Sequence, residues 1–231
     1  LLPNTQYFYR IEATNSEGTS QSTIGNFTTS FPPMSLITEY DFNNTYNNIN
    51  GNTPFNSNTG TSFVTGRDGV TTNGAININN TGSTATILNL PYGNASRTVS
   101  LWVKTNTMNS GYNMVFSYGQ GANSSAFGSS YNATICELFG FANNLSIASS
   151  NTNNTWYHFV YSYDGSNAKI YKNGALLTTV AKSWNTLNSS NIFKLGIGVG
   201  NEISFRGAID DLKIYNYAVT DADVTSLYTN N

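Results

Sequence analysis

Residues 156–180 constrain the fold more than any other part of this sequence. Their first run, WYHFVYSY, places aromatic and β-branched residues at period two, a pattern that suits a pleated, half-buried strand. Asp164-Gly165 and Asn173-Gly174 each favour a tight turn, because Asn, Asp and Gly tolerate the positive φ values of hairpin turns. The segment therefore predicts three antiparallel strands joined by two short turns, and with them an all-β fold.

Alternation along the first of these strands assigns its side chains to two faces. Tyr157, Phe159 and Tyr161 fall on one face, whereas His158 and Val160 fall on the other. His158 is the single histidine of the chain, so a histidine-based transition-metal cluster is not available. We therefore expect His158 to be a structural residue of the sheet.

Length and charge limit the partners of this chain. With 231 residues it can form one large β-sandwich, or a sandwich and a fragment of another module. Only 10% of the residues are charged and the formal net charge is −2, without a basic run, which argues against a nucleic-acid partner. No apolar run approaches the roughly 20 residues of a membrane span, so membrane insertion is not expected. The lack of an N-terminal signal segment predicts an internal part of a longer precursor.

Residues 1–30 are expected to be the end of a separate module. Their strand pattern resembles the last two strands of a fibronectin type III domain, which run Leu-x-Pro-x-Thr-x-Tyr-x-x-Arg-Val-x-Ala-x-Asn. The matching residues are Leu2, Pro3, Thr5, Tyr7, Arg10, Ala13 and Asn15. The resemblance implies that Tyr7 is the corner tyrosine of such a domain. Because two strands cannot bury a core, we expect the rest of this module to precede Leu1.

The remainder of the chain divides into a linker and a large domain. Residues 31–34 contain two consecutive prolines, which predict a short, stiff linker. Residues 35–231 show many short strand patterns separated by Gly- and Asn-rich turns, which predicts an antiparallel two-sheet β-sandwich of the jelly-roll type. One strand pattern contains the lone Cys136, expected to be a buried, inert thiol. Near the end, Thr220 and Asp223 form a weak capping box that predicts a turn of helix.

Three segments of the large domain together carry a family resemblance, which covers roughly residues 35–229. They are residues 100–104 (SLWVK), 156–174 and 205–218 (FRGAIDDLKIYNYA). They are similar to the forms SxWVK, WxHVxxxYDGxxxxLYxNG and FxGxIDDVRIYNRALS of laminin-G-like jelly rolls in the concanavalin A-like lectin/glucanase superfamily. The resemblance implies the fold but little about a ligand, because one fold can host many functions.

Enzymes also share this fold, so the acidic residues decide whether catalysis is expected. Retaining glycosidases of the superfamily carry the carboxylates of a Glu-x-Asp-x-x-Glu strand, and the two that react lie about 5 Å apart. Glu137 is alone on its strand, and the adjacent Asp210 and Asp211 point to opposite faces of theirs. The Gln-x-His and Arg-x-Glu-x-Arg signatures of jelly-roll polysaccharide lyases do not occur. We therefore expect no enzyme activity.

The family resemblance also implies a calcium site at the start of the last strand. There Asp210 shares a face with Leu212 and Ile214, so its carboxylate is directed inward and needs a partner. In the family this aspartate often completes a Ca²⁺ site with the loop after the first strand, where Asn47 and Asn48 could supply amide oxygens. Relatives commonly have aspartate in that loop, so asparagine predicts weaker binding. The alternative is that Asp210 only accepts backbone amides of the same loop.

A carbohydrate site requires an aromatic ring that stacks on a sugar, beside amides and hydroxyls. The candidate aromatic residues outside clear strand patterns are Tyr112, Phe127, Tyr131 and Trp184. Trp184 lies in a polar stretch after the meander and is the preferred ligand-binding residue. The alternative is an aromatic side chain that only packs a loop.

Together these observations favour a non-catalytic binding module, for carbohydrates or for adhesion to cell-surface polymers. The arrangement of modules and the Asn/Thr-rich composition resemble bacterial surface proteins, so we expect a secreted or cell-surface location and covalently linked neighbouring domains. Two alternatives stay open. One is a structural spacer that displays its neighbours without a ligand of its own, and the other is an accessory domain of a polysaccharide-degrading enzyme.

Overall fold

The chain forms two compact units, Leu1–Met34 and Ser35–Asn231. The computed structural model describes residues 6–28, 35–51, 53–79, 81–108, 111, 113–200, 202 and 205–229. The linker predicted at residues 31–34 lies outside the described residues.

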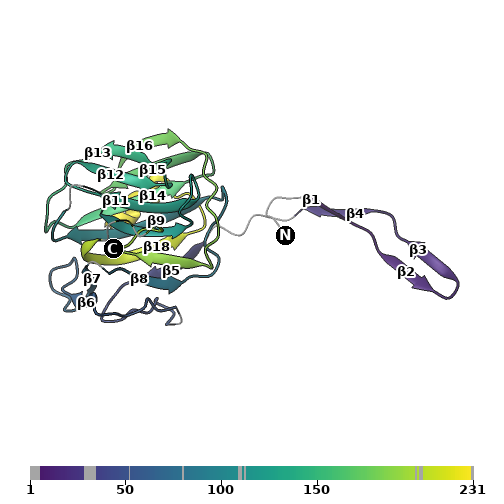
Figure 1. Cartoon of the computed structure of the whole chain (residues 1–231), viewed down its shortest axis with the longest axis horizontal. Helices are drawn as coiled ribbons and strands as arrows, with labels where there is room; N and C mark the ends of the chain where they lie inside the picture. The colour runs from purple at the N-terminus through teal and green to yellow at the C-terminus, as the bar shows by residue number, and fades with distance from the viewer. Residues whose placement is uncertain are drawn as a thin grey trace. The chain divides into compact units, whose positions relative to one another are not determined.

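The first unit consists of two antiparallel ribbons of two strands each (Figure 1). Its pairs are β1 (Gln6–Tyr9) with β4 (Gly25–Thr28), and β2 (Glu12–Asn15) with β3 (Gly18–Gln21). Tyr7 and Phe27 stack across the first ribbon with ring centroids 5.8 Å apart, but nearly all other side chains of the ribbons are exposed. The ribbons therefore bury no core, and their assignment to a fibronectin type III domain stays a prediction.

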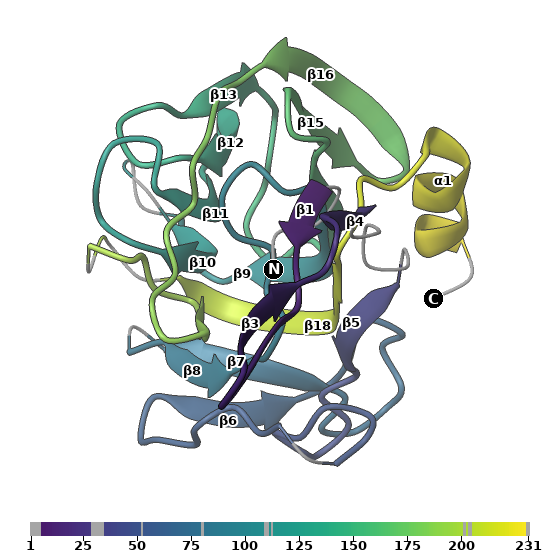
Figure 2. The ribbon, with the colours of Figure 1, turned by 90° about the vertical axis from the view of Figure 1, so that its right-hand side faces the viewer.

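The second unit is a sandwich of two antiparallel sheets (Figure 1, Figure 2). The strand order of the six-stranded sheet is β13-β12-β11-β10-β17-β8. Its strands are β8 (Ser83–Thr86), β10 (Met114–Gly119), β11 (Ala126–Tyr131), β12 (Ile135–Phe139), β13 (Leu145–Ala148) and β17 (Ile192–Leu195). The strand order of the eight-stranded sheet is β16-β15-β14-β9-β18-β7-β6, and β5 also pairs with β18. Its strands are β5 (Leu36–Tyr40), β6 (Thr61–Val64), β7 (Ala75–Asn79), β9 (Arg97–Thr105), β14 (Tyr157–Tyr163), β15 (Asn167–Lys172), β16 (Ala175–Ala181) and β18 (Arg206–Tyr215). The predicted two-sheet β-sandwich is confirmed.

The predicted three-stranded meander is present as β14, β15 and β16 at one edge of the eight-stranded sheet. Its faces are also as predicted, since Phe159 and Tyr161 point into the main core whereas Val160 packs in a separate cluster on the outer face. Asn173 (φ 50°) and Gly174 (φ 81°) form the second turn in the left-handed region, which is why the sequence needs these residues there.

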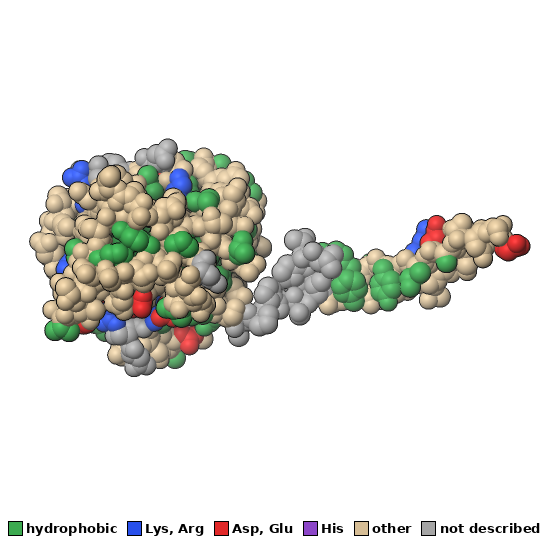
Figure 3. Space-filling model, turned by 90° about the horizontal axis from the view of Figure 1, so that it is seen from below, with side chains coloured by type: hydrophobic (Ala, Val, Ile, Leu, Met, Phe, Trp, Pro, Cys, Tyr) green, Lys and Arg blue, Asp and Glu red, His purple; other side chains and the backbone are tan. Residues whose placement is uncertain are grey.

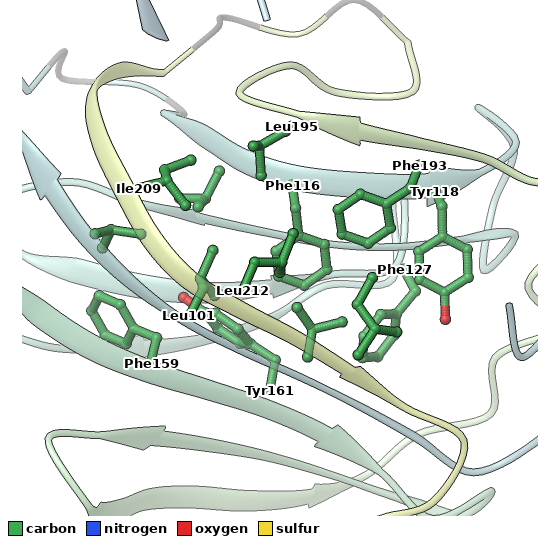
Figure 4. Packing of buried hydrophobic residues seen from close by; sticks show 14 of the residues in the cluster. Leu101, Phe116, Tyr118, Phe127, Phe159, Tyr161, Phe193, Leu195, Ile209 and Leu212 are labelled. Carbon is green, nitrogen blue, oxygen red and sulfur yellow. The ribbon is translucent and has the colours of Figure 1, made fainter. Parts of the chain in front are cut away.

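Side chains from the inner faces of both sheets fill the core between them (Figure 4). Phe116 of β10 and Phe193 of β17 stack with centroids 5.5 Å apart within the six-stranded sheet. Across the gap, Tyr161 and Phe116 pack in an edge-to-face arrangement with ring centroids 5.7 Å apart, so aromatic contacts join the two sheets directly.

Helix α1 (Asp221–Thr229) follows the last strand and packs on the outer face of the eight-stranded sheet through Val224. Its capping box is reciprocal, as predicted. The Thr220 amide donates to the Asp223 carboxylate at 2.8 Å, and the Asp223 amide donates to Thr220 Oγ1 at 3.2 Å. Within the described residues, no helix is long and apolar enough to cross a membrane.

The connection between β5 and β6, which both belong to the eight-stranded sheet, reaches the six-stranded sheet at the side opposite the meander. It runs beside β8, where the Asn56 amide donates to the Thr84 carbonyl oxygen at 2.9 Å and the Ser83 hydroxyl donates to the Asn56 carbonyl oxygen at 2.6 Å. Figure 2 shows β6 and β8 close together at the bottom of the molecule. Because β8 and β6 are the end strands of their sheets, this connection lines the closing edge of the sandwich.

Candidate functional site

The β5–β6 connection borders an open hollow of about 640 Å³ beside β6. The hollow is lined by Asn44, Thr45, Tyr46, Asn47, Pro54, Phe55, Asn56, Ser57 and Phe63. We call this set of residues the asparagine hollow. Its volume is comparable with that of small-molecule sites in proteins, but the hollow is open to solvent rather than enclosed.

Two half-buried aromatic rings form the apolar part of the asparagine hollow. Tyr46 and Phe63 pack with ring centroids 4.6 Å apart and planes tilted by 47°. The Tyr46 hydroxyl shares a hydrogen bond of 3.1 Å with Thr61 Oγ1, and the Phe55 amide donates to the Tyr46 carbonyl oxygen at 2.9 Å. Phe55 itself belongs to the core, whereas Tyr46 and Phe63 keep part of their surface accessible. The two rings are therefore held in place and still offer an apolar surface to a ligand.

Uncharged polar groups line most of the remaining hollow. The side-chain amides of Asn44 and Asn47 make no hydrogen bond to the part of the chain that the structure describes. Asn56 uses its Nδ2 to donate to Thr84 Oγ1 at 2.9 Å, and Ser57 is exposed. A primary amide both donates and accepts hydrogen bonds, which matches the hydroxyl groups of a sugar.

Hydrogen bonds fix the backbone on both sides of Asn47, at Asn44 and at Asn48. Asn44 has a φ of 55°, which asparagine tolerates, and its amide donates to the Asn73 carbonyl oxygen at 2.8 Å. Asn48 is buried, donates from Nδ2 to Thr38 Oγ1 at 3.2 Å and accepts from the Thr53 amide at 3.2 Å. Asn48 therefore fixes the connection, whereas its neighbour Asn47 lines the hollow.

The aromatic residues predicted to bind a ligand lie in the core instead. Their exposed fractions are 2% for Trp184, 1% for Tyr131 and 0% for Phe127. Phe127 and Tyr131 belong to β11, whose central Gly-Ser-Ser weakens the strand pattern in the sequence. Because a covered ring cannot stack on a sugar, the prediction of these three as ligand-binding residues is wrong. The fourth, Tyr112, lies outside the described residues.

Trp184 occupies a closed site near one end of the sandwich. Its Nε1 donates to the Asn143 carbonyl oxygen at 2.9 Å, and its ring centroid lies 5.1 Å from that of Tyr163 and 6.1 Å from that of Phe127. Gly140 permits this approach, since a Cβ atom at that position would come within 2.3 Å of Trp184 Nε1. Trp184 is thus a packing residue, the alternative to a ligand-binding role.

A β-bulge in β18 overturns the predicted direction of Asp210. The register with β9 shifts after Asp210, and Asp211 adopts a φ of 47°. The extra residue reverses the alternation, so Ile209 joins Leu212 in the core and Asp210 lies on the outer face, paired with Trp102 of β9. The prediction of an inward carboxylate that shares a face with Leu212 is therefore wrong.

The partners of Asp210 also differ from those expected for calcium binding. The buried Asp210 carboxylate accepts from the Arg67 amide at 3.1 Å and from the Asp211 amide at 2.9 Å. Arg67 lies between β6 and β7, not in the connection that carries Asn47 and Asn48. In the described part of the chain no three His, Cys, Asp or Glu side chains group to hold a metal. Ca²⁺ binding by these residues stays a prediction, which titration of Ca²⁺ into chelator-treated protein would test.

Asp210 predicts a pH dependence of stability. Burial, together with the neighbouring Asp211 carboxylate, raises the pKa of Asp210 from 3.8 to about 7. Between about pH 4 and pH 7 the folded protein keeps a proton that the unfolded chain has lost, so this group makes the free energy of unfolding fall as the pH rises. Asp210→Asn should flatten that fall. Urea denaturation across this pH range checks the result.

Asp68 provides a control, because its pKa is shifted in the direction opposite to that of Asp210. Hydrogen bonds from the Thr71 hydroxyl and from the amides of Thr71 and Val70 lower the pKa of this exposed carboxyl. Its contribution to stability is present above its ordinary pKa and is lost as the pH falls through the lowered value. Asp68→Asn should therefore change the pH dependence of stability only at the acidic end, below about pH 4, and leave the slope between about pH 4 and pH 7 as in the wild type. A fall in stability between about pH 4 and pH 7 that is as steep in Asp210→Asn as in the wild type would contradict the prediction.

The Glu137 carboxylate on the outer face of β12 is held by two serines. Ser130 Oγ donates to Oε1 at 3.4 Å and Ser146 Oγ donates to Oε2 at 2.6 Å, while burial raises the pKa of Glu137. Val199 packs near Met114 on the same face, which adds cover to this part of the sheet. The two serines thus contact both carboxylate oxygens of Glu137.

His158 and Cys136 are buried, which agrees with the structural roles expected for both. His158 Nε2 shares a hydrogen bond of 2.9 Å with Ser100 Oγ, and its ring stacks with that of Tyr228 of α1. Burial and two nearby cations lower the pKa of His158 to about 3, so the imidazole is neutral near pH 7. Burial likewise raises the pKa of the Cys136 thiol.

Comparison with known proteins agrees with the architecture. The model of the Laminin_G_3 family, described as the concanavalin A-like lectin/glucanases superfamily, matches residues 72–225, more than half of the chain. The chain belongs to this family. The laminin-G-like resemblance is thereby confirmed for the jelly roll, and the residues of the asparagine hollow precede the matched part. No curated protein matches the sequence.

Solved structures share the fold at low sequence identity. Domain 4 of AbnA, a GH43 extracellular arabinanase from Geobacillus stearothermophilus solved with arabinotriose, has a TM-score of 0.66 and 22% identity over 85% of this chain and 99% of its own. The binding domain of botulinum neurotoxin serotype G has a TM-score of 0.63 and 21% identity over 84% of this chain. That of Paraclostridial Mosquitocidal Protein 1 has a TM-score of 0.65 and 14% identity over 84% of this chain. This chain covers 50% and 52% of those two toxin domains.

Sequence reasoning missed Tyr46 and Phe63 as an aromatic surface. The stretch NTYNNINGNTPFNSN carries the available signal, because it sets two aromatic residues among asparagines in a long connection. Asn47 is expected from the sequence to bind a metal, whereas the structure places it beside Tyr46 in a hollow of neutral groups.

Proposed function

We propose that the jelly roll is a non-catalytic carbohydrate-binding module and that the asparagine hollow is its site. The observation that carries this proposal is the pairing of two fixed, partly accessible rings with neutral amides in one open hollow. The relatives solved with arabinotriose or described as binding domains support it, since the same fold serves recognition in them. We further propose that the module acts outside the cell within a larger protein, where it directs its neighbours to glycans or cell-surface polymers.

The proposal predicts that Tyr46→Ala weakens glycan binding by roughly tenfold, because a stacking ring supplies on the order of 1.4 kcal/mol or more of binding energy. The experiment begins with a polysaccharide panel in affinity gel electrophoresis. Isothermal titration with an oligosaccharide of the best ligand then gives the affinities of the wild type and the variant. Asn47→Ala should also weaken binding, and its amide makes no described hydrogen bond that folding would lose.

Two control variants separate binding from folding. Tyr46→Phe keeps the ring and loses only the hydroxyl contact with Thr61, so it should retain most of the affinity. Tyr217→Ala removes another half-buried tyrosine, one that packs with Tyr215 against the cluster around Val224, and should leave binding unchanged. If Tyr46→Ala and Tyr217→Ala bind equally well, the site lies elsewhere. A folded wild-type domain that binds no glycan would favour a spacer.

A further inference from the structure

We propose that the asparagine hollow selects uncharged glycan chains and excludes polymers that carry carboxylate or sulfate groups. This inference rests on the proposed function and names its ligand class. It follows from the charges of the whole domain as well as from the lining of the hollow.

Among the described residues that line the hollow there is no Lys, Arg, Asp, Glu or His side chain. Recognition of a carboxylate or sulfate normally uses charge-assisted hydrogen bonds from Arg or Lys, often in a bidentate geometry. Neutral amides such as those of Asn44 and Asn47 supply no charge-assisted hydrogen bond, so any loss of hydration by an anionic group in the hollow is poorly compensated. They do match neutral hydroxyl groups, which need one donor and one acceptor each.

The nearest charge along the chain has the wrong sign for an anionic ligand. Asp41 precedes the first lining residue, Asn44, by three positions, and its carboxylate accepts from the amide and the side chain of Asn43 at 3.2 Å. Asp41 belongs to the same β5–β6 connection as most of the lining residues, and a negative charge there disfavours an anionic polymer relative to a neutral one.

The basic residues elsewhere in the domain are already engaged. In the jelly roll, Arg67 pairs with Asp211, Lys213 with Glu39 and Lys169 with Asp221. Lys172, Lys182, Lys194 and Arg97 donate to backbone carbonyl oxygens, and Lys104 lies over the Trp156 ring. Arg10 lies in the first unit, and Arg206 completes the ten basic residues of the chain.

The domain therefore offers no cluster of available cations to an anionic polymer. The face of the molecule in Figure 3 agrees with this, because backbone and uncharged side chains cover most of the jelly roll and few Lys or Arg side chains are visible. The hollow is open, so it suits internal stretches of a chain as well as ends.

Matched polymers test the inference directly. The wild type is titrated with pairs that share a backbone and differ in charge: methyl-esterified homogalacturonan and polygalacturonate, hydroxyethyl and carboxymethyl cellulose, dextran and dextran sulfate. The neutral ligand that binds best in the panel is also oxidised at its primary hydroxyls to carboxylates. We expect binding of neutral polymers only, at least a tenfold loss on oxidation, and less than a twofold change in affinity between about 50 mM and 500 mM salt.

A positive charge introduced into the hollow tests whether affinity for an anionic ligand can be gained. Asn47→Lys should restore affinity for the oxidised ligand, and this gain should disappear at high salt, while Asn47→Gln should not restore it. Two other results are distinguishable. Salt-sensitive binding of an anionic polymer that is lost in Tyr46→Ala would overturn the inference and leave the proposed function intact. A folded wild type that binds no polymer at all would overturn both.

Discussion

Replacement of Arg97 by methionine is expected to lower the free energy of unfolding of the jelly roll by about 3–5 kcal/mol. The side chain is buried, and its guanidinium donates to the carbonyl oxygens of Pro91 at 2.9 Å, Gly93 at 2.8 Å and Ala95 at 2.8 Å. Methionine approximates the length of the side chain but leaves these three oxygens without a donor. Arg97→Lys should cost less than methionine but more than a neutral change, because an ammonium group lacks the planar fork that reaches all three.

Urea denaturation followed by tryptophan fluorescence measures the effect, with the slope against urea compared between variants. Arg206→Met serves as the matched control, because Arg206 is exposed on β18, where contacts open to water contribute up to about 1 kcal/mol, so its replacement should cost much less than Arg97→Met. Equal stability of Arg97→Met and Arg206→Met would show that the guanidinium does not hold the turn before β9.

Local patterns account for the parts of this fold that the sequence predicts. Asn173-Gly174 fixes a turn because few other residues adopt its backbone angles, and the period of two in β14 then assigns the core face. Thr220 and Asp223 define the start of α1 through hydrogen bonds only three residues apart. In each case the determining contacts lie close together in the sequence.

The candidate site depends on contacts that no local pattern contains. Tyr46 meets Phe63 only because the connection between them folds back along β8, which adjoins it through the Asn56–Thr84 pairing. The bulge at Asp211 reverses one half of β18 relative to the other, so alternation read from Leu212 backwards places Asp210 on the wrong face. Long-range pairing decides both features.

The second large effect concerns Trp184, the residue that the sequence favours most as a ligand platform. Trp184→Ala is expected to lower the free energy of unfolding by about 3–5 kcal/mol, because it removes a buried indole and leaves a cavity. Trp184→Phe should lose less, since it keeps a ring against Tyr163 and gives up the hydrogen bond to the Asn143 carbonyl oxygen. Thermal and urea denaturation measure both variants.

The glycan affinity of Trp184→Ala separates the packing role from a binding role. Measured under conditions where the variant is still folded, affinity should equal that of the wild type, because the hollow is built from other residues. A tenfold loss of affinity with unchanged stability would restore Trp184 as a ligand-binding residue.

Trp184 and Arg97 should also depend on one another. The Arg97 guanidinium lies 5.4 Å from the centroid of Phe127 and 5.5 Å from that of Tyr163, and these are the two rings that Trp184 contacts. Loss of either residue lets the shared rings relax, so the double variant should be less destabilised than the sum of the two single losses, by at least about 0.5 kcal/mol. Strict additivity in a double-mutant cycle would mean that Phe127 and Tyr163 stay fixed without their neighbours.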